Sequence, residues 1–424
     1  MRKPLNIVSL FDGMACGMLA FKSVGGLQIN RYDAYEIDKY AIQTATHNFP
    51  GITEHGDVFK EDFSKYKDVD FIIGGSPCTY WSIAQKNNRE TEASGLGWEL
   101  FSQYVRALRE IKPKFFIYEN NKSMSQAIRD SITETFGFEP ICINSALVSA
   151  QNRQRLYWVG KLNENGTYNK VNVQQPEDKG ILLKDILDGG AMDLTSNDKA
   201  WTLTASYDGA VAWNTIERSQ RNMCVEVVGG ALPVNTTTDE KAHTLKAQYF
   251  KNGTANFVTN GGFPASAVAE KVNDKPIQVG AMPRPNGELS TSQGFRIYDV
   301  EGKSVTLKGN AGGAGGKTGL YAVPTEFENG IPTKAISQVN GKSYPVYTVN
   351  DGKITIKGKE YPIKLQDGYY IIRKLSIDEC KRLQTVPEWY EFPVSNAQAY
   401  KMLGNGWTVD VIAHLIKACL KEGG

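Results

Sequence analysis

The sequence predicts an α/β fold in which helices cover both faces of a mostly parallel sheet, followed by a second, smaller, β-rich domain. Two observations predict this fold. Apolar runs of strand length alternate with amphipathic, helix-like stretches over roughly the first 160 residues, which is the pattern of a parallel sheet. From about residue 165 to about residue 372, glycine, asparagine, aspartate and threonine become more frequent and short β-like runs replace the helices. Helix-like patterns then return, so we expect the C-terminal segment to rejoin the first domain.

The predicted elements of the first domain follow one another in a regular order. Buried strands are expected where short apolar runs end in glycine or polar residues, at 6–11, 31–38, 69–75 and 114–120. Helices are expected at 18–25, 39–49, 100–113, 376–386 and 408–420. The helix at 100–113 has the clearest apolar stripe, formed by Phe101, Tyr104, Val105 and Leu108. In a sheet of this kind the ligand lies beyond the carboxyl ends of the strands.

Composition limits the function classes without choosing among them. The chain has 424 residues with 48 Lys and Arg against 46 Asp and Glu, and this balance argues neither for nor against a nucleic-acid partner. The six cysteines form no C-x-x-C pair, so we expect no metal site, no disulfide framework and a reducing, cytoplasmic compartment. No signal peptide or apolar run of membrane length is visible, so we expect no membrane partner. We also expect a monomer.

A five-residue pattern, Lys-x-x-Thr-Leu, occurs three times in the β-rich region, at 199–205, 241–247 and 303–309. We interpret the copies as similar hairpins of one β domain; the alternative is a set of loops that read a surface. The glycine-rich run at 311–318 resembles a phosphate-binding loop, but Ala311 stands where that motif has its first glycine. Strand-like sequence flanks the run on both sides and leaves no helix N-terminus for phosphate. We therefore reject a nucleotide triphosphatase.

The stretch GGSPC at 74–78 contains the main candidate for chemistry. The apolar strand residues stop at the glycines and Pro77 cannot extend the sheet, so Cys78 is expected beyond the carboxyl end of the strand. A thiolate in such a place can act as a nucleophile, although an unreactive buried cysteine is the commoner case. Glu119 and Asn120 end a later strand, and the stretch QNRQR at 151–155 adds two arginines. A thiol, a carboxyl and two guanidinium groups are therefore expected at one edge of the sheet.

Eight ordered blocks make the sequence resemble the DNA cytosine-5 methyltransferase family. The blocks are SLFDGMACG (9–17), EID (36–38), GDV (56–58), GGSPC (74–78), EN (119–120), QNRQR (151–155), RKLSIDECKRLQTVPEWY (373–390) and YKMLGNGWTVDVIAHL (400–415). They resemble phage and bacterial restriction-modification enzymes, with FDGMACG and GNGW similar to the animal de novo branch. The resemblance implies a Rossmann-like S-adenosylmethionine-dependent methyltransferase domain at 1–165, completed by 373–424, and a target recognition domain at 166–372. It also implies double-stranded DNA as the partner, in the cytosol of a bacterial host.

The resemblance implies roles for four candidate catalytic residues. Cys78 would add to C6 of a cytosine flipped out of the duplex, which makes C5 reactive toward the methyl group of S-adenosyl-L-methionine. Glu119 would hold N3 and the exocyclic amine and would protonate N3. Arg155 would bind the O2 edge, with Arg153 alongside. The base that removes the C5 proton stays open, with water as a candidate.

For the cofactor, S-adenosyl-L-methionine, the resemblance implies a pocket at the carboxyl ends of the first strands. Gly13 and Gly17 would let the backbone approach the methionine part, and Glu36 would accept the ribose hydroxyls. The other residues implied to line this pocket are Phe11 and Ile37 around the adenine, Asp57 and Val58 at its edge, and Asp12, Pro77, Asn405 and Trp407.

The polar segment 79–98 is expected to be a mobile loop that closes over the flipped base, with Gly95 and Gly97 as hinges; the alternative is a plain surface connection. Residues expected to contact DNA are Ser82, Lys86 and Arg89 in this loop and Gln248, Lys251, Asn252, Asn310 and Lys317 in the β-rich region. Thr79 and Asn121 depart from the family's usual residues near the inserted base.

Three alternative functions were weighed against this one. An RNA cytosine methyltransferase on the same scaffold is disfavoured by the large β-rich region, where the family reads duplex DNA. A catalytically silent DNA-binding paralogue is disfavoured by the intact Cys78, Glu119 and Arg155. A thymidylate-synthase-like enzyme, which would attack a free nucleotide, is disfavoured because its signature is missing from the sequence.

Overall fold

The computed structural model describes residues 3–77, 80–82, 89–188 and 373–423, and between 199 and 371 it describes the strands given below with a few adjoining residues. The chain divides into two compact units. The first unit comprises Met1–Val148, Gln154–Asp178 and Gln384–Gly424, and the second comprises Ser149–Arg153 and Lys179–Leu383. The C-terminal segment therefore rejoins the N-terminal part, as the returning helix pattern predicts.

The first unit is built on an eight-stranded mixed sheet. Its strands are β1 (Leu5–Leu10), β2 (Ile29–Tyr35), β3 (Thr53–Glu54), β4 (Phe71–Gly74), β5 (Phe115–Asn121), β6 (Ile141–Asn144), β8 (Gln154–Leu162) and β9 (Tyr168–Lys170). Their order is β3-β2-β1-β4-β5-β8-β6, with β9 paired to β8. The five neighbouring strands β3, β2, β1, β4 and β5 are parallel, whereas β8 runs antiparallel to its neighbours β5, β6 and β9. Strands β2 and β4 lie on opposite sides of β1, so the order in which successive strands are added to the sheet reverses at β1. Parallel sheets of this kind bind ligands at such a reversal, beyond the carboxyl ends of the strands.

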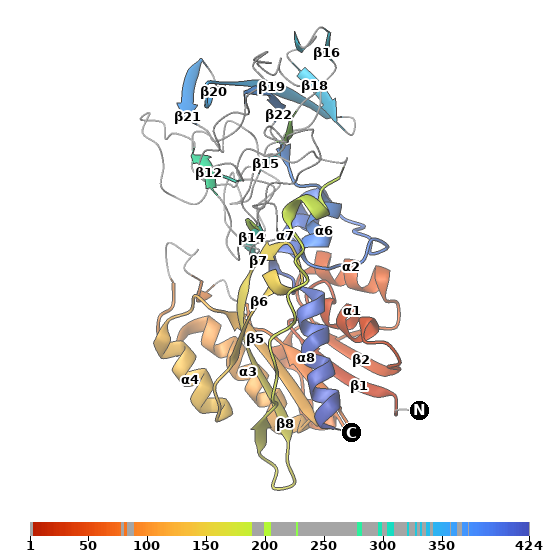
Figure 1. Cartoon of the computed structure of the whole chain (residues 1–424). Coiled ribbons are helices and arrows are strands. Elements are labelled where there is room, and N and C mark those ends of the chain that lie inside the picture. Colours follow the sequence, from red (N-terminus) through yellow and green to blue (C-terminus); the bar gives the residue numbers. More distant parts are fainter. Residues whose placement is uncertain are drawn as a thin grey trace, which may run out of the picture. The chain divides into compact units, whose positions relative to one another are not determined.

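Helices cover both faces of this sheet, with α3 and α4 on one face and α1 and α8 on the other (Figure 1). The helices of the first unit are α1 (Cys16–Ser23), α2 (Lys39–Asn48), α3 (Gly95–Ile111), α4 (Gln126–Phe136), α7 (Asn396–Asn405) and α8 (Val409–Glu422). Short 3-10 helices lie at Val58–Lys60, Phe63–Lys65 and Ser145–Leu147. The helices predicted for this unit all form, although the one predicted at 100–113 begins earlier, at Gly95.

The contact of α3 with the sheet holds β4 and β5 together. All four residues of the predicted apolar stripe on α3 are buried. Among them, Tyr104 is fully buried, and its hydroxyl donates to the carbonyl of Ile117 on β5 at 3.0 Å and, less closely, to that of Ile72 on β4 at 3.3 Å. One side chain thus links two adjacent parallel strands shortly before the ends that carry the candidate site.

The C-terminal segment completes the first unit. Helix α8 buries its apolar face, including Leu415, which has no exposed surface. The hydroxyl of Tyr390 donates to the carbonyl of Met14 at 2.5 Å, and Lys401 pairs with Asp38 at 2.6 Å. This return begins at Gln384, so the preceding helix α6 (Ile377–Leu383) groups with the second unit.

The second unit is rich in β structure, as predicted. Strands β7 (Gln151–Asn152), β10 (Lys199–Thr204) and β14 (Lys303–Lys308) pair with one another. A larger sheet contains β11 (Glu226–Val227), β22 (Gly368–Ile371), β19 (Lys342–Asn350), β20 (Lys353–Ile356) and β21 (Lys359–Pro362), with β18 (Ile336–Val339) on β19. The remaining pairs are β12 (Gln278–Ala281) with β13 (Arg296–Tyr298), β15 (Leu320–Tyr321) with β23 (Arg373–Lys374), and β16 (Phe327–Glu328) with β17 (Ile331–Pro332). A 3-10 helix lies at Leu183–Ile186.

Two copies of the Lys-x-x-Thr-Leu repeat are neighbouring parallel strands in matched register. Lys199 of β10 lies opposite Lys303 of β14, and Leu203 lies opposite Leu307. The segments that follow these two copies, where the second arm of each predicted hairpin would lie, are outside the described residues, so the interpretation as hairpins stays a prediction. The third copy of the repeat lies outside the described residues, and so does the glycine-rich run at 311–318. In the chain this run lies between strands β14 and β15.

We predict that Leu415→Ala lowers the free energy of unfolding of the first unit by about 2–5 kcal/mol, because it leaves a cavity in a fully buried face. Lys417→Ala, on the exposed side of the same helix, should change it by no more than about 0.5 kcal/mol. Denaturant unfolding of the full chain measures both. Equal effects of the two changes would show that α8 does not contribute to the core as described.

Candidate active site

The end of strand β4 fits closely against strands β1 and β5. A Cβ atom on Gly74 would lie 2.6 Å from the carbonyl oxygen of Leu10, and one on Gly75 would lie 2.7 Å from that of Glu119. Only glycine fits these two positions without moving backbone. Pro77 follows with an exposed side chain. Cys78 itself lies outside the described residues, so its predicted place beyond the strand stays a prediction.

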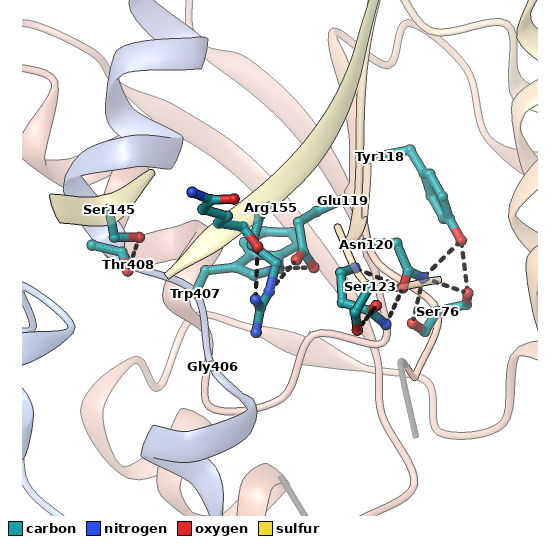
Figure 2. A network of polar contacts seen from close by, with 12 residues as sticks. Ser76, Tyr118, Glu119, Asn120, Ser123, Ser145, Arg155, Gly406, Trp407 and Thr408 are labelled. Atoms are coloured by element: carbon teal, nitrogen blue, oxygen red, sulfur yellow. Dashed lines mark hydrogen bonds and ion pairs between the residues drawn. The ribbon is translucent and has the colours of Figure 1, made fainter. Parts of the chain in front are cut away.

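A buried hydrogen-bond network fixes the backbone just before Pro77. The hydroxyls of Ser76 and Tyr118 lie 2.7 Å apart, and the amide of Asn120 donates to the carbonyl of Ser76 at 3.1 Å (Figure 2). Burial raises the pKa of Tyr118, which therefore stays a neutral hydroxyl. Sequence reasoning did not assign roles to Ser76 and Tyr118; the only signal was their place at adjacent strand ends.

Glu119, Arg155 and Trp407 converge at the carboxyl end of β5. The Nε atom of Arg155 lies 3.0 Å from Oε1 of Glu119, and the indole Nε1–H of Trp407 donates to Oε2 at 3.0 Å (Figure 2). The side chains of the ion pair are each 12% exposed. The structure thus brings together the predicted acid, the arginine predicted to bind the O2 edge of the base, and a residue predicted for the cofactor pocket.

Arg153 and Arg155 belong to different compact units. Arg155 is part of β8 in the first unit, whereas Arg153 belongs to the second unit and is 3% exposed. Its predicted role beside Arg155 stays a prediction.

Glu36 is the anchor of the predicted cofactor loop. Its Oε2 accepts from the backbone N–H of Gly13 at 2.9 Å, and its Oε1 accepts from those of Ile37 and Asp38 at 2.8 and 2.9 Å. Gly13 has a φ of +61°, which favours glycine, and no atom lies within 4 Å of the position of a Cβ. The side chain of Ile37 is 77% exposed beside this loop. The arrangement leaves the loop open for a ligand to pack on Ile37.

Other predicted cofactor residues have structural roles of their own. A Cβ atom on Gly17 would lie 2.3 Å from Ile73, so this glycine is required for packing α1 on the sheet. Asp57 caps the 3-10 helix that follows by accepting from the backbone N–H of Phe59 at 3.1 Å, and Val58 is buried. Phe11 packs half-buried against the core with a φ of 57°, and Asn405, the last residue of α7, is exposed.

Three carboxyl groups at the ends of β1, β2 and β3 repel one another. Asp12 accepts at Oδ1 from Ser9 at 2.5 Å and from Tyr32 at 2.6 Å, while its buried Oδ2 has no partner among the described residues. Burial, with a smaller effect of Glu36, raises the pKa of Asp12 to about 7. Burial and the charges of Asp12 and Glu36 raise the pKa of Glu54 to about 8. These charges make the end of the sheet suited to a ligand that carries positive charge.

The described parts of segment 79–98 are anchored to the first unit. Trp81 is fully buried, and its indole N–H donates to Glu90 at 3.0 Å. Arg89 donates to the carbonyls of Trp81 at 3.2 Å and Ser123 at 2.7 Å. Of the two predicted hinges, Gly97 lies inside α3, where a hinge would break the helix, and Gly95 is the first residue of that helix, with a φ of +79°.

The residues predicted to contact DNA are mostly beyond the described part of the chain. Arg89 is occupied by protein carbonyls, which leaves less of its guanidinium for phosphate, and Ser82 is half-buried. The others, Lys86, Gln248, Lys251, Asn252, Asn310 and Lys317, lie outside the described residues together with Thr79. Their roles stay predictions.

Neither a membrane span nor a metal cluster is found in the part of the chain that the structure describes. No described helix is long and apolar enough to cross a membrane. No three His, Cys, Asp or Glu side chains among the described residues are grouped as metal ligands would be.

Comparison with known proteins places these residues in a wider group. A family model for the C-5 cytosine-specific DNA methylases matches residues 5–421. The orphan methyltransferase M.SPRI of Bacillus phage SPR is 27% identical over 450 residues, covering 97% of each chain. The type II methyltransferase M1.ScrFI of Lactococcus lactis subsp. cremoris is 28% identical over 260 residues, covering 58% of this chain and 62% of that protein. The solved structure of the Entamoeba histolytica methyltransferase EhMeth aligns over the whole of both chains with 11% identity and a TM-score of 0.49.

We predict that Glu54→Gln stabilises the first unit at pH 8.5 and has little effect near pH 5. The pKa of Glu54 is raised on folding, so the fold loses stability as pH rises from the ordinary carboxyl pKa toward about 8. Glutamine cannot ionise and removes this loss. Thermal unfolding at the two pH values measures the effect, with Glu134→Gln, an exposed change on α4, as the control. A gain of equal size at both pH values would contradict the raised pKa.

Proposed function

The chain belongs to the C-5 cytosine-specific DNA methylase family, and from that premise we propose that it transfers a methyl group from S-adenosyl-L-methionine to C5 of a cytosine flipped out of duplex DNA. The observation that carries the proposal is the convergence of Glu119, Arg155 and Trp407 at the end of β5. That strand end is in contact with the glycines that precede Pro77 and Cys78.

The proposed reaction begins with nucleophilic attack by Cys78. As its sulfur bonds to C6 of the cytosine, Glu119 gives a proton to N3, so the electrons of the ring collect at C5. Arg155 binds the O2 edge and stabilises the charge that develops there. After C5 has been methylated, a base removes the C5 proton, the carbon–sulfur bond breaks, and the N3 proton returns to Glu119. Water is our candidate for that base.

The residues at the ends of β1 to β3 fit S-adenosyl-L-methionine. This cofactor supplies the methyl group from a positively charged sulfonium and also carries an ammonium group. A cationic ligand would favour the ionised forms of Asp12 and Glu54, whose pKa values are raised, and Asp12 has a buried oxygen without a partner among the described residues. Glu36 would hold the ribose hydroxyls, Phe11 and Ile37 would enclose the adenine, and Asp57 would accept from its amine. The closeness of Trp407 to Glu119 would put the cofactor and the base on adjoining sites.

The β-rich second unit is proposed to choose the DNA target. The family matches along almost the whole chain, so the second unit is part of the enzyme. Loops that follow the repeated strands would place Gln248, Lys251, Asn252, Asn310 and Lys317 against DNA, where base contacts specify and phosphate contacts position. Lys86 and Ser82 would contact the flipped base or its backbone. We propose that the enzyme works as a monomer on DNA in the bacterial cytosol.

We predict that the chain forms a denaturation-resistant adduct with duplex DNA in which every cytosine is 5-fluorocytosine, when S-adenosyl-L-methionine is present. Fluorine at C5 cannot leave as the proton does, so the bond between Cys78 and C6 persists. Cys78→Ser should abolish the adduct on a denaturing gel and leave DNA affinity within about twofold. An adduct that survives in this variant would sink the assignment of Cys78 as the nucleophile.

We predict that Glu119→Gln lowers the rate of methyl transfer by about 10²-fold or more, because the amide accepts hydrogen bonds but cannot supply the proton that N3 needs. Single-turnover transfer of labelled methyl to unmethylated genomic duplex DNA measures the rate. The affinity for S-adenosyl-L-methionine, measured by calorimetry, should stay within about twofold. A rate within a few-fold of wild type would rule out the carboxyl as the acid.

A further inference from the structure

Trp407 makes a contact that a role in the cofactor pocket does not explain. Its indole Nε1–H points at the carboxyl of Glu119 and donates to Oε2 at 3.0 Å, while Nε of Arg155 approaches Oε1 at 3.0 Å (Figure 2). Trp407 stands in the short connection between α7 and α8, 288 positions along the chain from Glu119. Each oxygen of the proposed acid is therefore held by a different donor.

The two donors constrain the two oxygens of Glu119 differently. An indole N–H only donates, so Oε2 stays an acceptor as long as Trp407 holds it. For Oε1 to carry the proton that Glu119 gives to N3, Arg155 must release Oε1 as its guanidinium engages the O2 edge of the base. We propose that Trp407 is a positioning residue for Glu119: it keeps Oε2 as the oxygen that accepts from the exocyclic amine and leaves Oε1 to give its proton to N3. This inference rests on the proposed function.

The connection that carries Trp407 is held rigidly. Gln384 is 1% exposed, and its amide donates to the carbonyls of Leu403 at 2.7 Å and Gly406 at 3.1 Å. The hydroxyl of Thr408 donates to the amide oxygen of Gln384 at 2.8 Å and lies 2.8 Å from that of Ser145. Trp407 is thus flanked on both sides by fixed backbone, which a positioning role requires.

Glu119 has little room to turn elsewhere. A Cβ atom on Gly75 would lie 2.9 Å from Oε2, so the backbone that follows β4 closes one side of the carboxyl. Trp407 and Arg155 close two others. Without the indole N–H, no other described side chain donates to Oε2. The carboxyl group could then rotate, and ordering it before each proton transfer would cost rate.

Trp158 provides a matched control for removing an indole N–H. It is fully buried on β8, and its Nε1–H donates to the hydroxyl of Thr133 at 3.3 Å rather than to Glu119. Trp158→Phe and Trp407→Phe each remove one such hydrogen bond from the first unit. A general loss of packing affects both variants, whereas a loss of positioning affects only Trp407→Phe.

We expect Trp407→Phe to lower the single-turnover rate of methyl transfer to unmethylated genomic duplex DNA by about tenfold or more, since a hydrogen bond to a charged acceptor is lost. The affinity for S-adenosyl-L-methionine should stay within about twofold. Trp158→Phe should leave both quantities within about twofold. If Trp407→Phe instead weakens cofactor binding and leaves the rate at saturation unchanged, the residue is only a wall of the cofactor pocket and the inference is wrong.

A double-mutant cycle tests whether the effect passes through Glu119. In the Glu119→Gln background, Trp407→Phe should cost less than about twofold, because the acid it positions is already absent. A full tenfold loss in that background overturns the proposal. If Trp407→Phe does not fold, replacing the indole by its benzothiophene isostere removes the N–H and keeps the shape, and the same comparison applies.

The wild-type chain separates this inference from the function on which it rests. Methyl transfer by the wild type together with an unaffected Trp407→Phe variant would overturn the role of Trp407 alone. Absence of both methyl transfer and the 5-fluorocytosine adduct in the wild type would overturn the proposed function itself.

Discussion

The close contact between the carboxyl ends of β4 and β5 is the constraint on which the candidate site depends. The two strands are parallel, and their ends can approach this closely only because Gly75 has no side chain to meet Glu119. Where the strand β4 ends, the network of Ser76, Tyr118 and Asn120 replaces the hydrogen bonds of the sheet. The chain therefore leaves the sheet in a fixed direction immediately before Pro77, and the carboxyl of Glu119 stands beside that exit.

The same end of the sheet concentrates negative charge at a cost in stability. Asp12, Glu36 and Glu54 end neighbouring strands, and burial together with mutual repulsion raises the pKa of Asp12 and of Glu54. A fold selected only for stability would place neutral side chains there. A positive charge nearby would relieve this repulsion, which fits the proposal that S-adenosyl-L-methionine, with its sulfonium and ammonium groups, binds at this end of the sheet. The stability of the first unit comes instead from the apolar core that packs α3 and α4 against the sheet.

The secondary structure and several site residues could be predicted from local patterns and ordered motifs. What could not be predicted depends on contacts between residues that are far apart in the sequence. The stripe on α3 and the alternation of strands and helices follow from periodicity, which depends on neighbours in sequence. Glu119 and Arg155 could be paired because both follow strand-like runs that end at one edge. The bond from Trp407 to Glu119 spans 288 residues and has no periodic signal. Arg89 illustrates the opposite case: its polar surroundings in sequence predict a DNA contact, whereas in the structure it donates to the backbone carbonyls of Trp81 and Ser123.

The order of the elements along the chain makes the proposed acid dependent on a segment that is synthesised after the second unit. Glu119 and Arg155 precede the whole second unit, whereas Gln384 and Trp407 follow it. Until the C-terminal segment packs on the first unit, Glu119 lacks the donor to its Oε2, and the apolar face of α8 is not yet buried. Domains generally fold as units, so the first unit becomes complete only after the second has been made. Because Trp407 follows the second unit in the chain, the proposed acid gains the donor to its Oε2 only after the unit proposed to select the target has been made.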